Sequence, residues 1–306
     1  MPHPQAIIDL GTNTFQLLIA EQMQGKMHVL YEDHRPVALG KGAMETGLLQ
    51  LDAMARAVEA LERFLWHAQD KSCVSIQGIG TSILRNARNA NAFIELVESQ
   101  LGIPIQVISG LQEADYIFQG IRHSLPDPWN EVSLVMDIGG GSVEFILFKD
   151  QTILYKTSLE LGGLKLQSLF QQDGEYHAML APSLDAYIQS GLKPLIEACA
   201  KYQPSRLIGA AGAFETLAEI QVAQGYLKTM QIANQLDLPA FYMLKDRIAS
   251  LTLEERQEIP GMKAYRASIL PYANHLIAQL MENTEINELW MSLYSLKEGY
   301  WYSIQE

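Results

Sequence analysis

The stretch Ile8-Asp9-Leu10-Gly11-Thr12-Asn13-Thr14-Phe15-Gln16 near the N-terminus returns as Met136-Asp137-Ile138-Gly139-Gly140-Gly141-Ser142-Val143-Glu144. The offset is 128 residues (137 minus 9), and it holds through the motif without a gap. In each copy an apolar run leads to an aspartate, a glycine-containing turn follows, and a second apolar run leaves. This pattern predicts a β-hairpin whose turn presents backbone N–H groups beside a carboxylate. A repeat of this length predicts two related domains.

The elements around the two copies repeat in the same order. Three consecutive strands are expected in each half, at 5–10, 14–21 and 27–39 and at 132–138, 142–149 and 152–159. Shorter strands are expected at 74–79, 105–108, 206–209 and 288–291. Helical spacing is found at 51–70, 89–100, 111–121, 164–171 and 177–201, from about 214, through most of 239–285, and at 295–303.

This organisation predicts an α/β protein with two domains, 1–126 and 127–306. The segment Leu125–Asn130 contains two prolines and no periodicity, so it is the expected linker. The last helix is expected to be able to pack back on the first domain.

Composition excludes several classes of function. The chain has 306 residues and a net charge of −13, which argues against a broad nucleic-acid surface. No stretch approaches about 18 apolar residues, so no membrane span is expected. The N-terminal residues show no secretory pattern, so a cytoplasmic location is expected. An acidic chain that binds phosphate needs backbone amides, local cations or a divalent metal.

Each repeated turn has the residue types of a phosphate and metal site. A carboxylate directly before a glycine turn, as at Asp9 and Asp137, can hold Mg²⁺ while the turn amides meet phosphate oxygens. The structural alternative for one copy is an ordinary hairpin-turn aspartate. Three successive glycines at 139–141 cost conformational entropy, which favours close approach of a ligand.

Three further segments have functional and structural readings that the residues leave open. Gly209–Ala213 is either an anion site at a helix start or an ordinary strand–helix turn. Thr81–Asn89 carries Arg85 and Arg88, which suit phosphate but are also ordinary surface cations. In Ser109–Ala114, Glu113 is either a general base or a carboxylate that pairs with the helix dipole.

Together these motifs resemble the exopolyphosphatase/guanosine pentaphosphate phosphatase family, in its short two-domain form. The matching segments include Asp9–Thr14, Thr81–Asn89, Ile108–Ala114 and Asp137–Glu144, and weaker matches extend over essentially the whole chain. The resemblance implies membership of the sugar kinase/Hsp70/actin superfamily. Its members have two ribonuclease H-like (actin-like ATPase) domains with a cleft between them.

The resemblance also implies roles for individual residues. Glu113 falls where the family has the carboxylate that activates the attacking water, and Asp137 and Glu144 fall where it holds a divalent cation such as Mg²⁺. These three are the expected catalytic residues, and Asp9 is an expected third metal ligand. The expected phosphate-binding residues are Gly11, Asn13, Thr14, Arg85, Gly139, Gly140, Gly141, Ser142 and Gly212.

The chain departs from the family pattern at phosphate-gripping positions. Gln16 stands where the family usually has Arg or Lys, Val143 stands where it has Thr, and Gly212-Ala213 stands where it has Gly-Thr. The carboxylates are intact. The departures lower the expected turnover and affinity for long polyphosphate.

The expected activity is therefore metal-assisted release of terminal phosphate from inorganic polyphosphate, or of the 5′-phosphate of pppGpp. Two alternatives stay open: a catalytically weak sensor that binds ppGpp or polyphosphate, and an ATP-using kinase or ATPase on the same fold. The expected partners are polyphosphate or guanosine penta/tetraphosphate, with no nucleic acid and no membrane. A homodimer is suggested by the resemblance.

Overall fold

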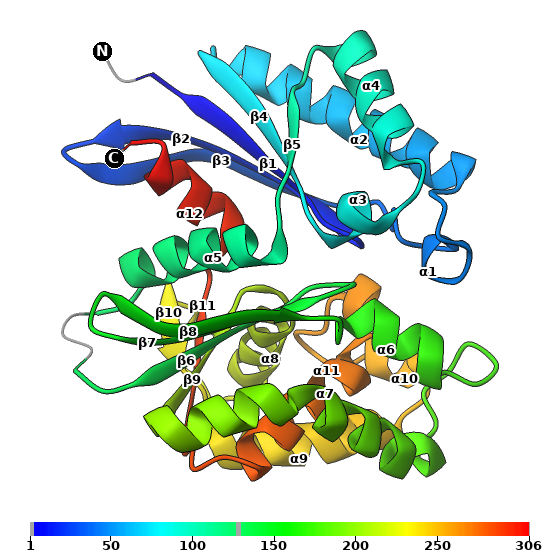
Figure 1. The fold of residues 1–306 in the computed structure, drawn as a ribbon, viewed down its shortest axis with the longest axis vertical. Coiled ribbons are helices and arrows are strands. Elements are labelled where there is room, and N and C mark those ends of the chain that lie inside the picture. The colour runs from blue at the N-terminus through cyan, green and yellow to red at the C-terminus, as the bar shows by residue number, and fades with distance from the viewer. Residues whose placement is uncertain (1–2, 127–129, 306) are drawn as a thin grey trace. The chain divides into compact units, whose positions relative to one another are not determined.

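A computed structural model describes residues 3–126 and 130–305. It contains two compact units (Figure 1). Unit 1 comprises Met1–Gly120 and Leu296–Glu306, and unit 2 comprises Ile121–Ser295. The division falls inside helix α5 (Gly110–Ser124). The predicted linker at 125–130 includes residues 127–129, which lie outside the described residues.

Unit 1 is built on a five-stranded sheet with the order β3-β2-β1-β4-β5. β1, β2 and β3 are antiparallel neighbours, whereas β4 and β5 run parallel to β1. Figure 1 shows α2 and α4 along one face of this sheet and α12 against the strands on the other. The strands are β1 (Gln5–Leu10), β2 (Thr14–Met23), β3 (Lys26–Pro36), β4 (Ser75–Gly80) and β5 (Ile105–Val107). The helices are α1 (Ala43–Thr46), α2 (Leu51–Asp70), α3 (Ser82–Asn86), α4 (Ala90–Leu101), α12 (Leu296–Ser303) and the first part of α5.

Unit 2 is built on a six-stranded sheet with the order β10-β11-β9-β6-β7-β8. Its core joins apolar side chains of the sheet, among them Phe145, to the helices through Phe214, Phe241 and Tyr272. The strands are β6 (Ser133–Ile138), β7 (Val143–Lys149), β8 (Thr152–Leu159), β9 (Arg206–Ala210), β10 (Ala233–Gln235) and β11 (Glu288–Ser292). The helices are α6 (Gly163–Phe170), α7 (Ala181–Tyr202), α8 (Gly212–Ala223), α9 (Leu238–Ser250), α10 (Leu253–Gln257) and α11 (Leu270–Glu282), with 3-10 turns at Ala178–Leu180 and Ala264–Arg266.

The two predicted hairpins are confirmed, and they have the same register. Asp9 of β1 lies directly opposite Gln16 of β2, and Asp137 of β6 lies directly opposite Glu144 of β7. Directly opposed residues point to the same face of a sheet. The second hairpin therefore places two carboxylates side by side, whereas the first places a carboxylate beside an amide.

In each unit the segments singled out by the sequence follow the same edge of the sheet. β1, β4 and β5 are parallel, so the segments after Leu10, Gly80 and Val107 start at one edge. β6, β9 and β11 are likewise parallel. Ligand sites in α/β proteins lie at the carboxyl ends of such strands.

The sequence interpretation missed some short elements and joined others. β10 has three residues and pairs with β11, so it lacks the alternation that identifies a longer strand. The stretch 239–285 is three helices and a 3-10 turn, with breaks at Leu251 and at Pro260-Gly261. None of the helices in the described residues combines the length and apolar character needed to cross a membrane.

Helix α12 is held in unit 1 by close packing and by a buried charge. A Cβ added at Gly299 would lie 1.6 Å from the carbonyl oxygen of Tyr116, so only glycine allows this contact with α5. Lys297 has a nearly buried side chain, and its Nζ pairs with Glu298 and lies 3.2 Å from an Oε1 atom of Glu32 on β3. Burial alone would lower the pKa of Lys297, but Glu298 and Glu32 outweigh it and raise that pKa.

Lys297→Met is expected to destabilise unit 1 by about 3–5 kcal/mol, because it leaves the buried Glu298 carboxylate without this cation. Urea unfolding followed by tryptophan fluorescence, to which Trp301, fully buried on α12, contributes, measures the change. The double variant Lys297→Met/Glu298→Gln should recover part of the loss. Lys71→Met is the control, because its ion pair with Asp70 is exposed and should change stability by less than about 1 kcal/mol. Equal effects of the two single variants would contradict the assignment.

Candidate functional site

The first turn of unit 1 is shaped by a close approach of its own backbone. A Cβ added at Gly11 would lie 2.8 Å from the carbonyl oxygen of Thr14, so a side chain at this position would collide with the turn. Thr12 is buried, whereas Asn13 and Thr14 are half-buried. The turn is thus tight, and it presents polar side chains and a half-buried Asp9 at the edge of the sheet.

Arg85 and Glu113 form a pair at the same edge of unit 1. Arg85, on α3, donates from Nη1 to the carbonyl oxygen of Ile108 at 2.8 Å and to Oε2 of Glu113 at 3.1 Å. Glu113, in the first turn of α5, is 8% exposed. The guanidinium stabilises the negative charge of this carboxylate and limits its rotation. Arg85, expected to bind phosphate, is therefore also the group that positions the expected base.

Other residues of these two segments have structural roles. Arg88 donates from Nη2 to the carbonyl oxygen of Thr46, and the Asn89 side chain bonds both the N–H and the carbonyl of Leu49. Both residues hold the loop around α1. Ser109 caps α5 together with Gln112, in a reciprocal capping box. Capping is therefore done by these two residues, and Glu113 is not required for it.

The carboxylates of the second hairpin are each oriented by a serine hydroxyl. Ser158 of β8 donates to Oε1 of Glu144 at 2.7 Å, and Ser295 donates to Oδ2 of Asp137. Glu144 is 1% exposed, so its carboxylate is enclosed by protein. Hydrogen bonds of this kind fix the direction in which the remaining carboxylate oxygens point.

The three-glycine turn of unit 2 is fixed through its carbonyl groups. Gly162, Gly163 and Lys165 donate their backbone N–H groups to the carbonyls of Gly141, Gly139 and Gly140 respectively. A Cβ added at Gly162 would lie 2.4 Å from the backbone of Gly140 and Gly141. Among the described residues, the N–H groups of Gly140 and Gly141 donate no hydrogen bond.

The carbonyls of this turn are thus occupied while two amides are available to an acceptor. Successive free amides of this kind form an anion-binding concavity. A negatively charged phosphate oxygen is a suitable acceptor for them.

The donor set of unit 2 suits a hard divalent cation. Asp137 and Glu144 supply carboxylate oxygens from adjacent strands, which are the ligands that Mg²⁺ prefers. Within the described residues, no group of three or more His, Cys, Asp or Glu side chains is arranged to hold a metal. Mg²⁺ commonly uses one or two carboxylates plus water and substrate phosphates, so two carboxylates fit that mode.

The third predicted turn, before α8, is strained. Ala211 has φ 42° and ψ −141°, a conformation that residues with a side chain rarely adopt. Its N–H donates to the carbonyl of Ser292 at 2.7 Å. A Cβ at Gly209 would overlap the ring of Phe214, so the strand and the helix approach closely here.

Arg266 lies beside this turn, and the sequence interpretation gave it no role in the site. Its Nη1 atom is 3.3 Å from the position of a Cβ at Gly212, whose φ is 53°. Its Nε atom is buried and has no hydrogen-bond partner in the described part of the chain. A guanidinium at the N-terminus of a helix adds to the attraction for an anion. Only the tertiary structure brings residues 212 and 266 together.

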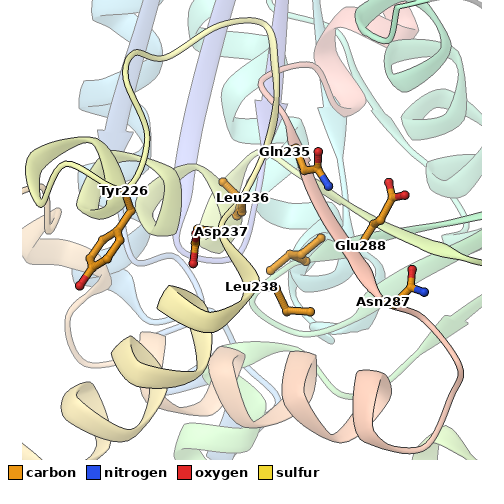
Figure 2. A pocket seen from close by; sticks show the side chains of 8 residues that line it. Tyr226, Gln235, Leu236, Asp237, Leu238, Asn287 and Glu288 are labelled. Atoms are coloured by element: carbon orange, nitrogen blue, oxygen red, sulfur yellow. The ribbon is translucent and has the colours of Figure 1, made fainter.

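The cavities found in unit 2 lie apart from these turns. One, of about 360 Å³, is lined by residues near β10, α9 and β11, including Tyr226, Asp237 and Glu288. Figure 2 shows Leu236 and Leu238 between Tyr226 and Glu288 in this view. A second cavity, of about 440 Å³, lies at the ends of α7 and α11. None of the predicted site residues lines either cavity.

The chain is similar to solved structures over nearly its whole length. A crystal structure of an exopolyphosphatase from Cytophaga hutchinsonii is 34% identical, with a TM-score of 0.94, and the alignment covers 99% of this chain and 97% of that one. A Ppx/GppA family member from Aquifex aeolicus, 24% identical, has the same fold with a TM-score of 0.80 over 100% of this chain and 98% of that one.

A curated relative is the guanosine-5′-triphosphate,3′-diphosphate pyrophosphatase of Vibrio parahaemolyticus. It is 30% identical over 299 residues, which are 98% of this chain and 59% of that protein. The chain thus spans about three-fifths of the length of that relative. The expected α/β class with two ribonuclease H-like domains is confirmed by the structural neighbours. The family model described as the Ppx/GppA phosphatase family matches residues 18–306, and the chain belongs to this family.

Proposed function

We propose that the chain is a phosphoanhydride hydrolase that releases terminal phosphate from inorganic polyphosphate or the 5′-phosphate of pppGpp. The observation that carries the proposal is Glu113, a nearly buried carboxylate held by Arg85 at the edge of unit 1. The names of two relatives support it, because one is an exopolyphosphatase and the other a pyrophosphatase of a guanosine nucleotide.

In the proposed mechanism, Glu113 accepts a proton from the attacking water. Arg85 keeps the carboxylate of Glu113 in one orientation, in which it is proposed to face the water. Phosphoryl transfer needs little covalent chemistry from the protein, and positioning and charge stabilisation supply most of the acceleration. Arg85 and Glu113 are therefore proposed to act together by placing an ionised carboxylate next to the proton that the attacking water must lose.

The glycine turns are proposed to bind the phosphate oxygens. The free amides of Gly140 and Gly141 are donors, and Gly139 and Ser142 complete that turn. Gly11, Asn13 and Thr14 are proposed to do the same in unit 1. Gly212 and the neighbouring Arg266 would hold another phosphate group of the substrate, because a helix N-terminus and a guanidinium both favour an anion.

Asp137 and Glu144 are proposed to hold Mg²⁺ or another divalent cation in unit 2. Such a cation would neutralise charge on the phosphate oxygens during the displacement. Ser158 and Ser295, which donate hydrogen bonds to these carboxylates, would keep their oxygens directed at the cation. The net charge of −13 makes a cation at this place chemically reasonable for a polyanionic substrate.

A second function, a weakly active sensor of ppGpp or polyphosphate, is favoured by one feature of the chain. Gln16 lies opposite Asp9 where the second hairpin has a carboxylate, and it carries no charge. A site with reduced charge for the transition state could bind a phosphorylated ligand without rapid turnover.

Glu113→Gln is expected to lower kcat for phosphate release from polyphosphate by roughly 10²–10⁴-fold, because the amide cannot accept the proton. Phosphate release with Mg²⁺ is measured over a panel of polyphosphate, pppGpp and ATP. Glu95→Gln, an exposed change on α4, is the matched control and should retain activity. Full activity of Glu113→Gln would contradict the assigned mechanism. Micromolar binding without turnover by the wild type would favour the sensor.

Asp137→Asn and Glu144→Gln are each expected to raise the Mg²⁺ concentration for half-maximal activity by about tenfold or more, because each removes a charged ligand. Activity is measured over a Mg²⁺ titration at saturating polyphosphate. Asp150→Asn, in the exposed β7–β8 turn, should leave the titration unchanged. An unchanged Mg²⁺ requirement in both site variants would show that the cation is held elsewhere.

A further inference from the structure

The segment that follows β3 in unit 1 is docked on the first glycine turn. Pro36, the last residue of β3, is paired with Thr14, the first residue of β2, so the chain leaves β3 at the same edge as the turn. Ala38 then donates its N–H to the carbonyl of Asn13, and Gly40 donates to the carbonyl of Thr12, both at 2.8 Å. The segment 37–42 therefore lies along the turn.

This docking is tight and leaves little freedom to the segment. A Cβ added at Gly40 would lie 2.3 Å from Cγ2 of Thr12, so a side chain at this position would have to displace the Thr12 side chain. Ala38 and Gly42, on either side, both have positive φ, at 52° and 72°. The N–H of Lys41 donates to the carbonyl of Ala38 and closes a turn. The backbone of Lys41 is consequently held at a fixed place beside the Gly11–Thr14 turn.

Lys41 differs from the neighbouring cations of unit 1 in its pairing. Arg85 is bonded to Ile108 and Glu113, and Arg88 is bonded to Thr46. Lys41 is exposed, and no ion pair involves it in the part of the chain that the structure describes. Its ammonium group is thus available to an anion.

The turn beside Lys41 has no cation of its own. Residues 9–16 contain no lysine or arginine, and the motif carries the negative charge of Asp9. Free turn amides and a few hydroxyls bind phosphate more weakly than they do with a cation present. A flexible ammonium on a fixed backbone supplies charge without demanding the planar geometry of a guanidinium.

We infer that Lys41 binds phosphate groups of the polyanionic substrate at the Gly11–Thr14 turn, and that it supplies the positive charge that Gln16 cannot. The inference rests on the proposed hydrolase function. It assigns to Lys41 a role in substrate affinity and not in the chemical step.

Lys41→Gln removes the charge and keeps most of the length of the side chain. The expected result is a KM for polyphosphate about three- to tenfold higher, with kcat changed by less than about twofold. The reason is that the lost interaction stabilises the bound substrate and the transition state equally. The dependence of KM on salt concentration should also become shallower, because one fewer cation neutralises the polyanion. Lys41→Arg should retain the wild-type KM, and Gln16→Arg should restore it in the Lys41→Gln background.

Lys26→Gln is the matched control. Lys26 is an exposed lysine at the start of β3, so the length of the β2–β3 ribbon, about 30 Å, separates it from the turn. It should change neither KM nor its salt dependence.

An unchanged KM and salt dependence in Lys41→Gln, with an active wild type, would overturn the inference and leave the hydrolase proposal intact. If the wild type releases no phosphate from any substrate, the hydrolase proposal fails. Calorimetric binding of polyphosphate to wild type and Lys41→Gln then decides the inference, since equal affinities would overturn it and weaker binding by the variant would support it.

Discussion

The site residues in both units depend on a close approach of backbone to backbone inside the two hairpin turns. At Gly11 and Gly139 a Cβ would come within 2.8 and 2.9 Å of the carbonyl oxygen three residues on. This contact sets the curvature of each turn and hence where the flanking aspartate and hydroxyls point. Each turn is also the docking place of a second segment, 37–42 in unit 1 and 162–165 in unit 2. A rigid turn on a buried sheet is what a phosphate site needs, because its donors must not reorganise during the reaction.

Charge is distributed locally in this acidic chain. Its few cations near the turns are used in distinct ways: Arg85 holds a carboxylate, Arg88 holds a loop, and Arg266 lies at a helix start. Lys41 lacks an ion pair among the described residues. The carboxylates Asp137 and Glu144 lie side by side on adjacent strands, and each accepts a hydrogen bond from a serine. Anions and a divalent cation can both be accommodated in a chain whose net charge would repel a polyanion.

Much of the architecture was predictable because the repeated motif and the apolar periodicity agree. The register of Asp9 with Gln16 and of Asp137 with Glu144 follows from hairpin geometry, and the structure has it. The missed parts have local signals too weak to read. β10 is a three-residue edge strand, and the breaks within 239–285 depend on packing against the sheet. The role of Arg85 was only half foreseen, because its bond to Glu113 joins residues 28 positions apart.

The sequence by itself determined the fold class, the duplicated turns and the positions of the carboxylates. Those features depend on residue type and short-range spacing, and both can be read from the sequence. Tertiary structure alone decided which side chains act together: Arg85 with Glu113, Ser158 with Glu144, Arg266 with Gly212, and the Lys41 segment with the first turn. The physical reason is that strand pairing brings the ends of separate segments to one edge of a sheet. No local pattern records which of those segments will meet there.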